Sequence, residues 1–459
     1  MSLYYLLLLM TRFHNDPRFG VMLFNAGIVV VTPAKVVGLL TVVAAVLADR
    51  PKGAVPRGPS AMGLLWTAFA IMQVLGTFAF SLPIPSESIS SLLSFSLMLV
   101  ATRLLITTED RMIKSVRVLV LTSALASLWL YREYFWQHFY RAEGVEQDSN
   151  YEALTLVMSI PLAVWMARYE ATSFWRRVAA GCTVGMGGGL ILTQSRAGLI
   201  SAAVMGLAAV LYSRRKGAAL AMLALAAAVA IEFAPPRLLQ RFYHIKLNGA
   251  VTNGDDESSR LHYELLKAGL AMIRSQPLTG VGLQRFRDEA PAYNPEIVQI
   301  AGHSYIAHDT YVQIAAESGL LALALFLSLI GLAALNCRAV RRRAGQPMPQ
   351  LALAMQIALI GFGIGASSVT AEYVVPFWLI IFFSQNLREI AAAAAAFDPA
   401  PEKQAHETPR ERTPVTAPTR PSFGRLEQPG EKRIEPLRFV TPRAAASRAA
   451  SAGKQGRAE

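Results

Sequence analysis

Long apolar runs separated by short polar connections make up most of the first 397 residues of this chain. An α-helix needs about 20 apolar residues to cross the roughly 30 Å hydrocarbon core of a bilayer. Such runs predict membrane-spanning helices at 28–47, 61–82, 89–106, 112–130, 151–168, 178–193, 197–213, 218–233, 308–335, 350–371 and 374–391. The pattern therefore predicts an all-α, polytopic integral membrane protein with about 11–12 transmembrane helices.

The twelfth span depends on the first apolar run, Leu3–Met10, which is too short to cross a membrane alone. It either forms a span together with Val21–Ile28 or continues a span that begins upstream. No basic segment or small-residue cleavage site frames it, so we do not expect a cleaved signal peptide.

One long polar segment, residues 235–307, interrupts the apolar pattern. Within it, Ser258 is a good N-cap and Pro277 a stop signal, so we expect a helix between them. Its apolar side is predicted to hold Leu261, Leu265, Met272 and Ile273, and its polar side Arg260, Glu264, Lys267 and Arg274. This amphipathic helix is expected outside the membrane, on the bilayer or on the helix bundle. The stretch GVGLQRF, residues 280–286, predicts a turn, because no βαβ unit surrounds it.

Lysine and arginine gather in every second connection between the apolar runs. The basic connections are 50–57, 103–117, 168–177, 214–216 and 338–343, and the other short connections hold few such residues apart from the mixed segment 132–141. The segment 235–307 contains eight, but loops of that length cross the membrane largely regardless of charge. Basic connections stay on the cytoplasmic side of a membrane. The segment 235–307 is therefore expected outside the cytoplasm, and the C-terminal tail inside it.

The net charge of +13 does not indicate nucleic-acid binding, because it is spread over the basic connections and a tail, residues 398–459. The tail is basic, rich in proline and poor in apolar residues, so we expect it to be disordered. It is either inert or contacts anionic membrane lipids. The expected division is a transmembrane helical domain, residues 1–397, and this tail. Cys182 and Cys337 lie on different spans, which indicates neither a disulfide framework nor a thiolate metal site.

Glycines recur at a spacing of four residues in two apolar runs, as Gly181, Gly185 and Gly189 and as Gly361 and Gly365. Small residues at this spacing let membrane helices approach each other closely. We expect both sets to serve helix packing. The chain shows no pair of matched broken helices, which would point to a transporter.

Two arginines are candidates for binding phosphate. Arg196 lies in the turn LTQSRAGL, on the side of the membrane assigned to the long loop. It is either an interfacial anchor or a phosphate clamp, since a guanidinium binds phosphoryl oxygens through two hydrogen bonds. Arg260, at the start of the loop helix, is either a solvated arginine or a second arm of that clamp.

His308 opens the span that follows the loop, with Asp309 and Glu317 behind it. A neutral imidazole there could accept a proton from a hydroxyl group. His303 and His308 could instead bind a metal ion. Their spacing fits no helical register and no third ligand is evident, so we do not favour a metal site.

The segments LILTQSRAGLISAAV, SRLHYELLKAGLAMIRSQPLTGVGLQRF and AHDTYVQIAAESGLLAL resemble the O-antigen ligase and polymerase superfamily. The hallmarks of that family are a T-x-S-R-[GA] turn, a P-L-x-G-x-G-x-x-x-F segment in a large periplasmic loop, and H-N-x-Y-L-x-x-x-x-E-x-G at the start of the next helix. The resemblance covers residues 189–335 in the correct order. Asp309 stands where the family usually has Asn, which adds a carboxylate beside His308.

The resemblance implies a membrane glycosyltransferase of the bacterial inner membrane, with the loop 235–307 in the periplasm. It would transfer an undecaprenyl-diphosphate-linked glycan to an acceptor hydroxyl, without a cofactor or a metal ion. Arg196 and Arg260 would bind the diphosphate, and His308 would act as the base or orient the acceptor. Asp309 and Glu317 are also expected at the substrate site.

The acceptor implied by the resemblance is a second glycan for a polymerase, lipid A core for a ligase, or a protein side chain for an oligosaccharyltransferase. The sequence does not choose among these three acceptors. A lipid-linked glycan flippase is the alternative from another class of protein. It would place charges in the middle of several spans, whereas the ionisable groups here lie mostly at the outer helix ends.

Overall fold

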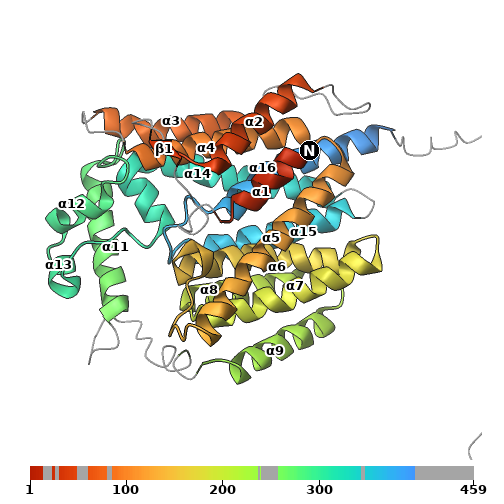
Figure 1. Cartoon of the computed structure of the whole chain (residues 1–459). Helices are drawn as coiled ribbons and strands as arrows, with labels where there is room; N and C mark the ends of the chain where they lie inside the picture. Colours follow the sequence, from red (N-terminus) through yellow and green to blue (C-terminus); the bar gives the residue numbers. More distant parts are fainter. Residues whose placement is uncertain are drawn as a thin grey trace, which may run out of the picture. The chain divides into compact units, whose positions relative to one another are not determined.

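The computed structural model of the chain describes residues 1–13, 23–25, 30–48, 60–79, 85–235, 238, 257–342 and 347–397. Within these ranges the chain is almost entirely helical, as Figure 1 shows, and the strands β1 (Phe24–Asn25) and β2 (Val30–Val31) form one short antiparallel pair. The helices are α1 (Ser2–Met10), α2 (Pro33–Leu47), α3 (Ala61–Ala79), α4 (Ser86–Leu105), α5 (Glu109–Phe135), η1 (Gly144–Glu146), α6 (Ser149–Tyr169), α7 (Ser173–Leu192), α8 (Arg196–Tyr212), α9 (Lys216–Glu232), α11 (Glu257–Ser275), α12 (Phe286–Tyr293), α13 (Glu296–Ala301), α14 (Thr310–Arg341), α15 (Met348–Gly365) and α16 (Val375–Phe397). The predicted all-α class is confirmed.

Among the described residues, 5 helices are long and apolar enough to cross a membrane, namely α3, α4, α5, α14 and α15. The apolar helices α2 and α8 are shorter. Other predicted spans are present as helices that are shorter or more polar, such as α7 and α9. The polytopic membrane fold is thus confirmed, while the number of about 11–12 spans stays a prediction. Phe24 and Asn25 form strand β1, so Val21–Ile28 does not continue the helix α1 as a span.

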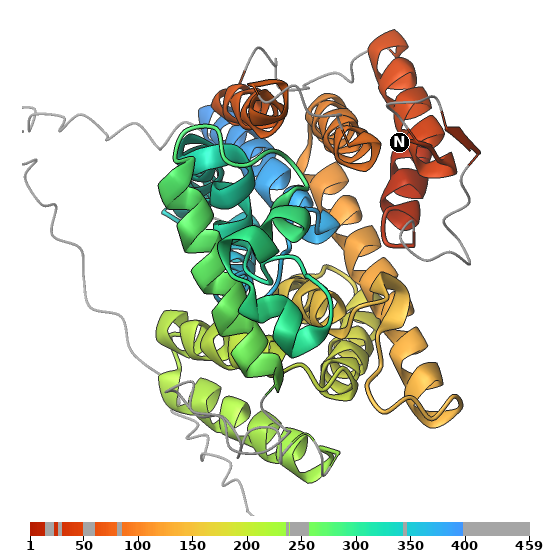
Figure 2. The ribbon, with the colours of Figure 1, turned by 90° about the vertical axis from the view of Figure 1, so that its left-hand side faces the viewer.

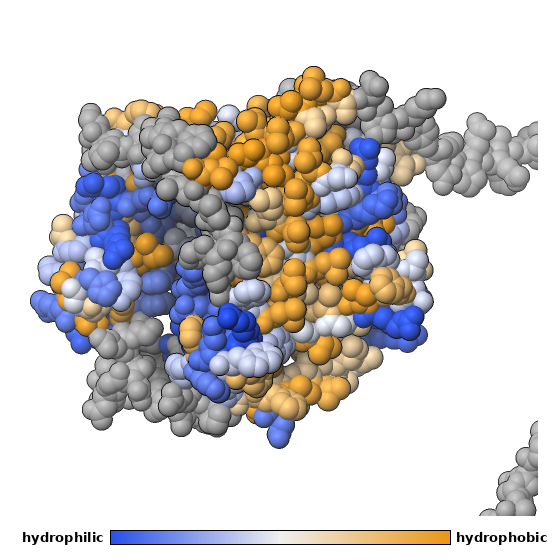
Figure 3. Space-filling model, viewed as in Figure 1, coloured by the Kyte–Doolittle hydropathy of each residue, from blue (hydrophilic) through white to orange (hydrophobic). Residues whose placement is uncertain are grey.

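Apolar side chains lie exposed on the outside of the helices. Figure 3 shows them as a band across the middle of the visible face, with hydrophilic residues gathered on both sides of the band. Helix α9 is the extreme case, because none of its residues is buried. An apolar surface of this kind is unfavourable in water but suits contact with lipid tails.

Aromatic side chains fill the centre of the bundle where α3, α14 and α16 meet. Trp66 of α3 contacts Trp378 of α16 edge-on, with ring centroids 4.6 Å apart. Phe326 of α14 lies 5.8 Å from Phe69 of α3 by the same measure. Ring pairs of this geometry add to the stabilisation from apolar contact. This packing anchors α14, whose first turn follows His308.

The connections predicted to share the outer side of the membrane meet at one end of the bundle. There the Ser195 hydroxyl donates to Asn150 Oδ1 at 2.8 Å, and the Thr310 hydroxyl donates to the Val369 carbonyl at 2.6 Å. Each hydrogen bond joins two connections that the alternation of basic residues assigns to the outer side of the membrane.

The connections predicted to be cytoplasmic also contact one another. Arg103 forms an ion pair with Glu389 at 2.6 Å, and Arg117 forms one with Glu170 at 2.9 Å. Arg341 lies over the ring of Tyr212, 4.5 Å from its centroid. The structure therefore groups the connections into two sets as the charge pattern predicts.

The loop between α9 and α14 places α11, α12 and α13 across one end of the bundle, at the left of Figure 1 and facing the viewer in Figure 2. The predicted loop helix is confirmed as α11, which ends before Pro277. Leu265 and Met272 are fully buried, as expected for its apolar side. Glu264, predicted on the polar side, forms an ion pair with Lys267 of that side, but its carboxylate is buried and also accepts a hydrogen bond from Asn294. Helices α12 and α13 were not predicted.

A sharp kink at Gly319 joins the loop to the membrane bundle. Gly319 has φ +83° inside α14, and the turn that precedes α12 packs against this kink. The Leu320 N–H donates to the Pro277 carbonyl at 2.8 Å, and the Gly282 N–H donates to the Glu317 carbonyl at 3.0 Å. The turn predicted at residues 280–286 is present, and its backbone bonds fix the start of α14 against the loop.

The two glycine sets behave differently. A Cβ at Gly361 would lie 2.7 Å from a Val157 methyl group, and one at Gly365 would lie 2.5 Å from Leu154, so this pair brings α15 close to α6 as predicted. At Gly181 and Gly185 the described residues leave the space around a Cβ empty within 4 Å. The close approach predicted for this set is therefore present at Gly189, where a Cβ would lie 3.0 Å from Leu130 Cδ1, and is not present at Gly181 and Gly185. The tail, residues 398–459, lies outside the described residues, and the predicted division at that point stays a prediction.

Candidate functional site

Arg196 begins helix α8, and its position is fixed by the residue before it. The Ser195 hydroxyl accepts a hydrogen bond from the Gly198 N–H at 3.1 Å, which caps the helix. The same hydroxyl donates to Asn150 Oδ1 at 2.8 Å, near the start of α6. Arg196 is partly buried. Its guanidinium is therefore carried by a helix terminus that is tied to a second helix terminus.

Arg141 brings a second guanidinium to the same place. Its Nη2 donates to Asn150 Oδ1 at 2.5 Å, and its Nε donates to the Thr193 carbonyl at 3.1 Å. Asn150 thus accepts hydrogen bonds from both Ser195 and Arg141. The carboxylate of Asp148, two residues earlier, accepts from the backbone N–H groups of Asn150 and Tyr151 and caps α6.

His308 immediately precedes the capping residue of α14. The Asp309 carboxylate accepts hydrogen bonds from the Tyr311 and Val312 N–H groups at 2.8 and 3.0 Å. An asparagine would cap the helix in the same way, which explains why Asp can stand where the resembling family has Asn. His308 itself has φ +51°, a left-handed conformation that is uncommon for a side chain of its size. The turn directs its ring toward α11.

The ring of His308 stacks on that of His262 from α11, with centroids 4.9 Å apart and an interplanar angle of 3°. Burial, followed by the neighbouring His308, Arg196 and Arg141, lowers the pKa of His262 to about 4. Burial also lowers the pKa of His308 below its ordinary 6.5, although the carboxylate of Asp148 opposes this shift. Both imidazoles are therefore neutral at neutral pH, and each has one nitrogen able to accept a proton.

This cluster, defined as Arg141, Arg196, His262 and His308, joins two permanent cations to two neutral bases. Arginine side chains keep their charge at any physiological pH and suit phosphate or carboxylate groups. A neutral histidine beside them can accept a proton from a reacting hydroxyl. The arrangement can bind an anion and remove a proton at the same place.

Arg260 lies on another side of α11. Its guanidinium forms an ion pair with Glu296 of α13 at 3.8 Å, and both side chains are about half exposed. Because successive residues are about 100° apart around a helix, Arg260 and His262 point in different directions. Arg196 acts electrostatically on His262, whose ring stacks on that of His308, whereas Arg260 pairs with Glu296. The roles predicted for Arg196 and His308 stay predictions. The predicted role of Arg260 stays a prediction.

Glu317 lies two residues before the kink in α14 and is buried, at 1% exposure. Its two carboxylate oxygens accept hydrogen bonds from the Gln284 and Phe286 N–H groups, each at 3.0 Å. The Gln313 amide donates to the same carboxylate. These contacts hold the turn 280–286 against α14, and the predicted contact of Glu317 with substrate stays a prediction.

The sequence did not single out His262 or Arg141. His262 is 46 positions from His308 in the chain, and only the fold reveals that the two rings stack. A signal for Arg141 did exist, because the segment 132–141 is the exception to the alternation of charge. A basic residue on the side that usually lacks them indicates a specific anionic partner. Within the described ranges no three His, Cys, Asp or Glu side chains gather as a metal site needs.

A family model described as O-antigen ligase matches residues 181–327. The matched segment runs from α7 to α14 and contains Arg196, Arg260, His262, His308 and Glu317. A search among curated proteins gave no match. The resemblance drawn from the sequence motifs is thus confirmed: residues 181–327 are similar to the O-antigen ligase and polymerase superfamily.

Proposed function

We propose that the protein transfers a glycan from undecaprenyl diphosphate to a hydroxyl group of an acceptor, on the periplasmic face of the bacterial inner membrane. The observation that carries this proposal is the cluster of two arginines and two stacked, neutral histidines at the end of the bundle where α11–α13 lie. The family match and the apolar helices around the cluster support it.

The diphosphate of the donor would bind to Arg196 and Arg141. As the bond between the sugar and the diphosphate breaks, negative charge grows on the leaving oxygen, so a fixed cation stabilises the transition state more than the bound substrate. Arg260 is the proposed second arm from α11. Its surface ion pair with Glu296 contributes at most about 1 kcal/mol, so Arg260 can leave Glu296 and bind a phosphate group with little loss of free energy.

His308 is the proposed base. The acceptor oxygen attacks the anomeric carbon, the bond from that carbon to the diphosphate breaks, and the acceptor proton passes to the imidazole of His308. Undecaprenyl diphosphate leaves with the electrons of the broken bond. The glycosyl–diphosphate bond supplies the driving force, so we propose that no nucleotide cofactor takes part and that the arginines neutralise the leaving group without a metal ion.

The proposed reaction can be tested with the full chain reconstituted in liposomes with the lipid-linked glycan of its own host. We expect formation of transferred glycan by the native protein and loss of transfer in His308→Ala, with donor binding retained because a base acts in the chemical step. His303→Ala is the matched control, because His303 is exposed and outside the cluster. Near-normal transfer by a well-folded His308→Ala variant would contradict the assignment.

The acceptor can be identified in a strain that lacks the protein. Loss of long glycan chains would indicate a polymerase, loss of glycan from lipid A core would indicate a ligase, and loss of protein glycosylation would indicate an oligosaccharyltransferase. An unchanged set of glycans would contradict the proposed function.

A further inference from the structure

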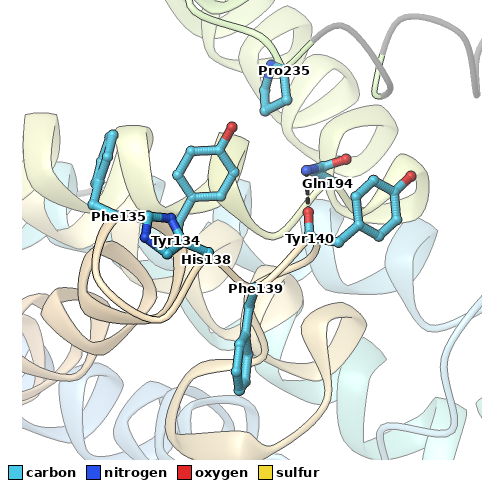
Figure 4. Close-up of a pocket in the computed structure, with 7 residues that line it drawn as sticks. All are labelled: Tyr134, Phe135, His138, Phe139, Tyr140, Gln194 and Pro235. Atoms are coloured by element: carbon cyan, nitrogen blue, oxygen red, sulfur yellow. Dashed lines mark hydrogen bonds between the residues drawn. The ribbon is translucent and has the colours of Figure 1, made fainter.

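A cavity of about 570 Å³ opens beside the cluster, and Figure 4 shows its lining. Its wall comes from three separate parts of the chain, the end of α5 with the connection after it, the turn before α8, and the residues just after α9. The lining residues are Tyr134, Phe135, His138, Phe139, Tyr140, Gln194 and Pro235. Tyr140 directly precedes Arg141, and Gln194 lies two residues before Arg196, so the lining and the cluster share two segments of the chain.

We propose that this cavity binds a sugar residue of the glycan, next to the position at which the glycan is transferred. The proposal rests on the proposed function and names a subsite for it. Sugar rings present C–H faces that pack on aromatic rings, and hydroxyl groups that need hydrogen-bond partners. The lining supplies both, because the phenol, imidazole and amide groups of Tyr134, Tyr140, His138 and Gln194 stand among the rings.

The connection that carries most of the lining is held in a defined shape. The buried Glu133 carboxylate accepts hydrogen bonds from the Glu143 and Gly144 N–H groups at 2.9 and 2.8 Å. The Gln194 amide donates to the Tyr140 carbonyl at 2.5 Å, which joins the connection to the turn before α8. A ligand that enters a preformed wall loses less free energy to the ordering of side chains.

Two features favour a sugar over a lipid chain as the occupant. The polar groups of the lining would be left without partners by an acyl chain. The lining residue Gln194 directly follows Thr193, whose carbonyl accepts a hydrogen bond from Arg141 Nε at 3.1 Å, and the diphosphate is proposed to bind at Arg141. Phe139 and Tyr140 are each 46% exposed, so their rings are accessible to a ligand from outside.

The test measures binding of the host's glycan, released from its lipid by mild acid, to the purified full chain in detergent. Saturation transfer from aromatic protons to the sugar ring protons would report the contact. We expect Phe139→Ala and Tyr140→Ala each to weaken binding about five- to tenfold, because each removes one ring contact. Tyr140→Phe keeps the ring and should retain most of the binding.

Trp136→Ala is the matched control. Trp136 lies in the same connection, is 74% exposed and does not line the cavity, so it represents an exposed aromatic residue outside the proposed subsite. We expect its glycan affinity to match that of the native protein. An equal loss in Trp136→Ala, or native binding in both alanine variants of the cavity, would overturn the proposal.

Transfer kinetics identify which sugar occupies the cavity. A raised KM for the lipid-linked donor in Phe139→Ala would place a donor sugar there, and a raised KM for the acceptor would place an acceptor sugar there. Both results support the subsite, whereas an unchanged KM for both substrates contradicts it. Binding of the glycan by a native protein that shows no transfer would retain the subsite and reject the proposed function, so the two failures are distinguishable.

Discussion

The chemistry of the candidate site depends on the protonation of one residue pair. His262 and His308 stack face to face, and a proton on one ring disfavours a proton on the other. Arg196 and Arg141 add to this effect at His262, and burial acts on both rings. A histidine with an ordinary pKa would be partly protonated near pH 6.5 and unable to act as a base in that fraction of molecules.

The first prediction concerns the pH dependence of transfer. His308 accepts a proton only in its neutral form, and its pKa lies below the ordinary 6.5. The rate constant kcat/KM should therefore stay high as the pH falls to 6.5 and should decrease only below that value. In His262→Ala the ring that covers His308 is lost, so the pKa of His308 should rise toward 6.5 and the acid limb should move to higher pH.

This profile also separates a positioning role of His262 from a structural one. A merely destabilised variant would lose activity by a similar factor at every pH at which it stays folded. If kcat/KM of His262→Ala decreases at the same pH as in the native protein, the stacking does not control the protonation of His308.

The second prediction concerns the geometry of phosphate binding. Arg196→Ala should lower kcat/KM, because it should raise the free energy of the transition state by roughly 2–5 kcal/mol. This is the range seen when one partner of a desolvated charge pair is removed. Arg196→Lys keeps the charge but loses the planar fork, so we expect a loss of roughly tenfold or more. The control is Arg274→Ala, an exposed arginine of α11, which should leave transfer near the native level. Full activity of Arg196→Lys would show that charge alone suffices.

At the scale of single elements, the kink in α14 separates the first turns of this helix, which follow His308, from its long apolar part. The helix changes direction at Gly319, and the turn after Pro277 packs against the kink. A Cβ at Gly319 would lie 2.1 Å from the Leu278 carbonyl oxygen, and one at Gly280 would lie 2.2 Å from the Glu317 carbonyl carbon. Both glycines are needed because two backbone segments approach too closely for any side chain.

The third prediction tests this contact. Gly319→Ala places a side chain at φ +83° and against backbone, so it should lower the free energy of unfolding by about 2 kcal/mol or more. Gly331→Ala on the same helix meets nothing within 4 Å among the described residues and should be neutral or stabilising by up to about 1 kcal/mol. Thermal unfolding of both variants in detergent compares them. Equal midpoints would show that the kink does not depend on the glycine.

The apolar runs were enough to predict the positions of most helices, because a lipid environment leaves the backbone few alternatives to a helix. The predicted span 112–130 lies within α5, and the loop helix was expected where α11 is found. The short helices α12 and α13 were missed because Pro291 and Pro295 indicate turns and each helix has few residues to show a periodicity. The burial of Glu264 was not predicted, because a helical pattern does not show which neighbour will cover a polar residue.

The candidate site was predictable only where the motif itself carries the residues. Arg196 and His308 stand at the hallmark positions of the motifs, whereas His262 lies in a motif segment but not at a hallmark position. His262 and Arg141 join them through the tertiary fold, by a ring contact and by the shared acceptor Asn150. Contacts between residues far apart in the chain leave no local pattern in a single sequence.

For the whole molecule, the hydrophobic band of Figure 3 lies between two hydrophilic sides, and the cluster belongs to the side with α11–α13. An undecaprenyl chain is fully apolar and its diphosphate is charged. A site at the boundary of the band lets the lipid stay in the membrane while the diphosphate meets arginine side chains. The reaction that we propose therefore requires this side to face the periplasm.

The fourth prediction tests that orientation by labelling single cysteines with a membrane-impermeant maleimide. The background replaces the two native cysteines, Cys182 and Cys337, which are both free thiols. Asp288→Cys, exposed on α12, should react in intact spheroplasts, because the positive-inside rule places this loop in the periplasm. Arg215→Cys, exposed in a basic connection, should react only after the membrane is permeabilised. The reverse pattern would place Arg196 and His308 in the cytoplasm, away from a periplasmic glycan donor, and the proposed function would fail with it.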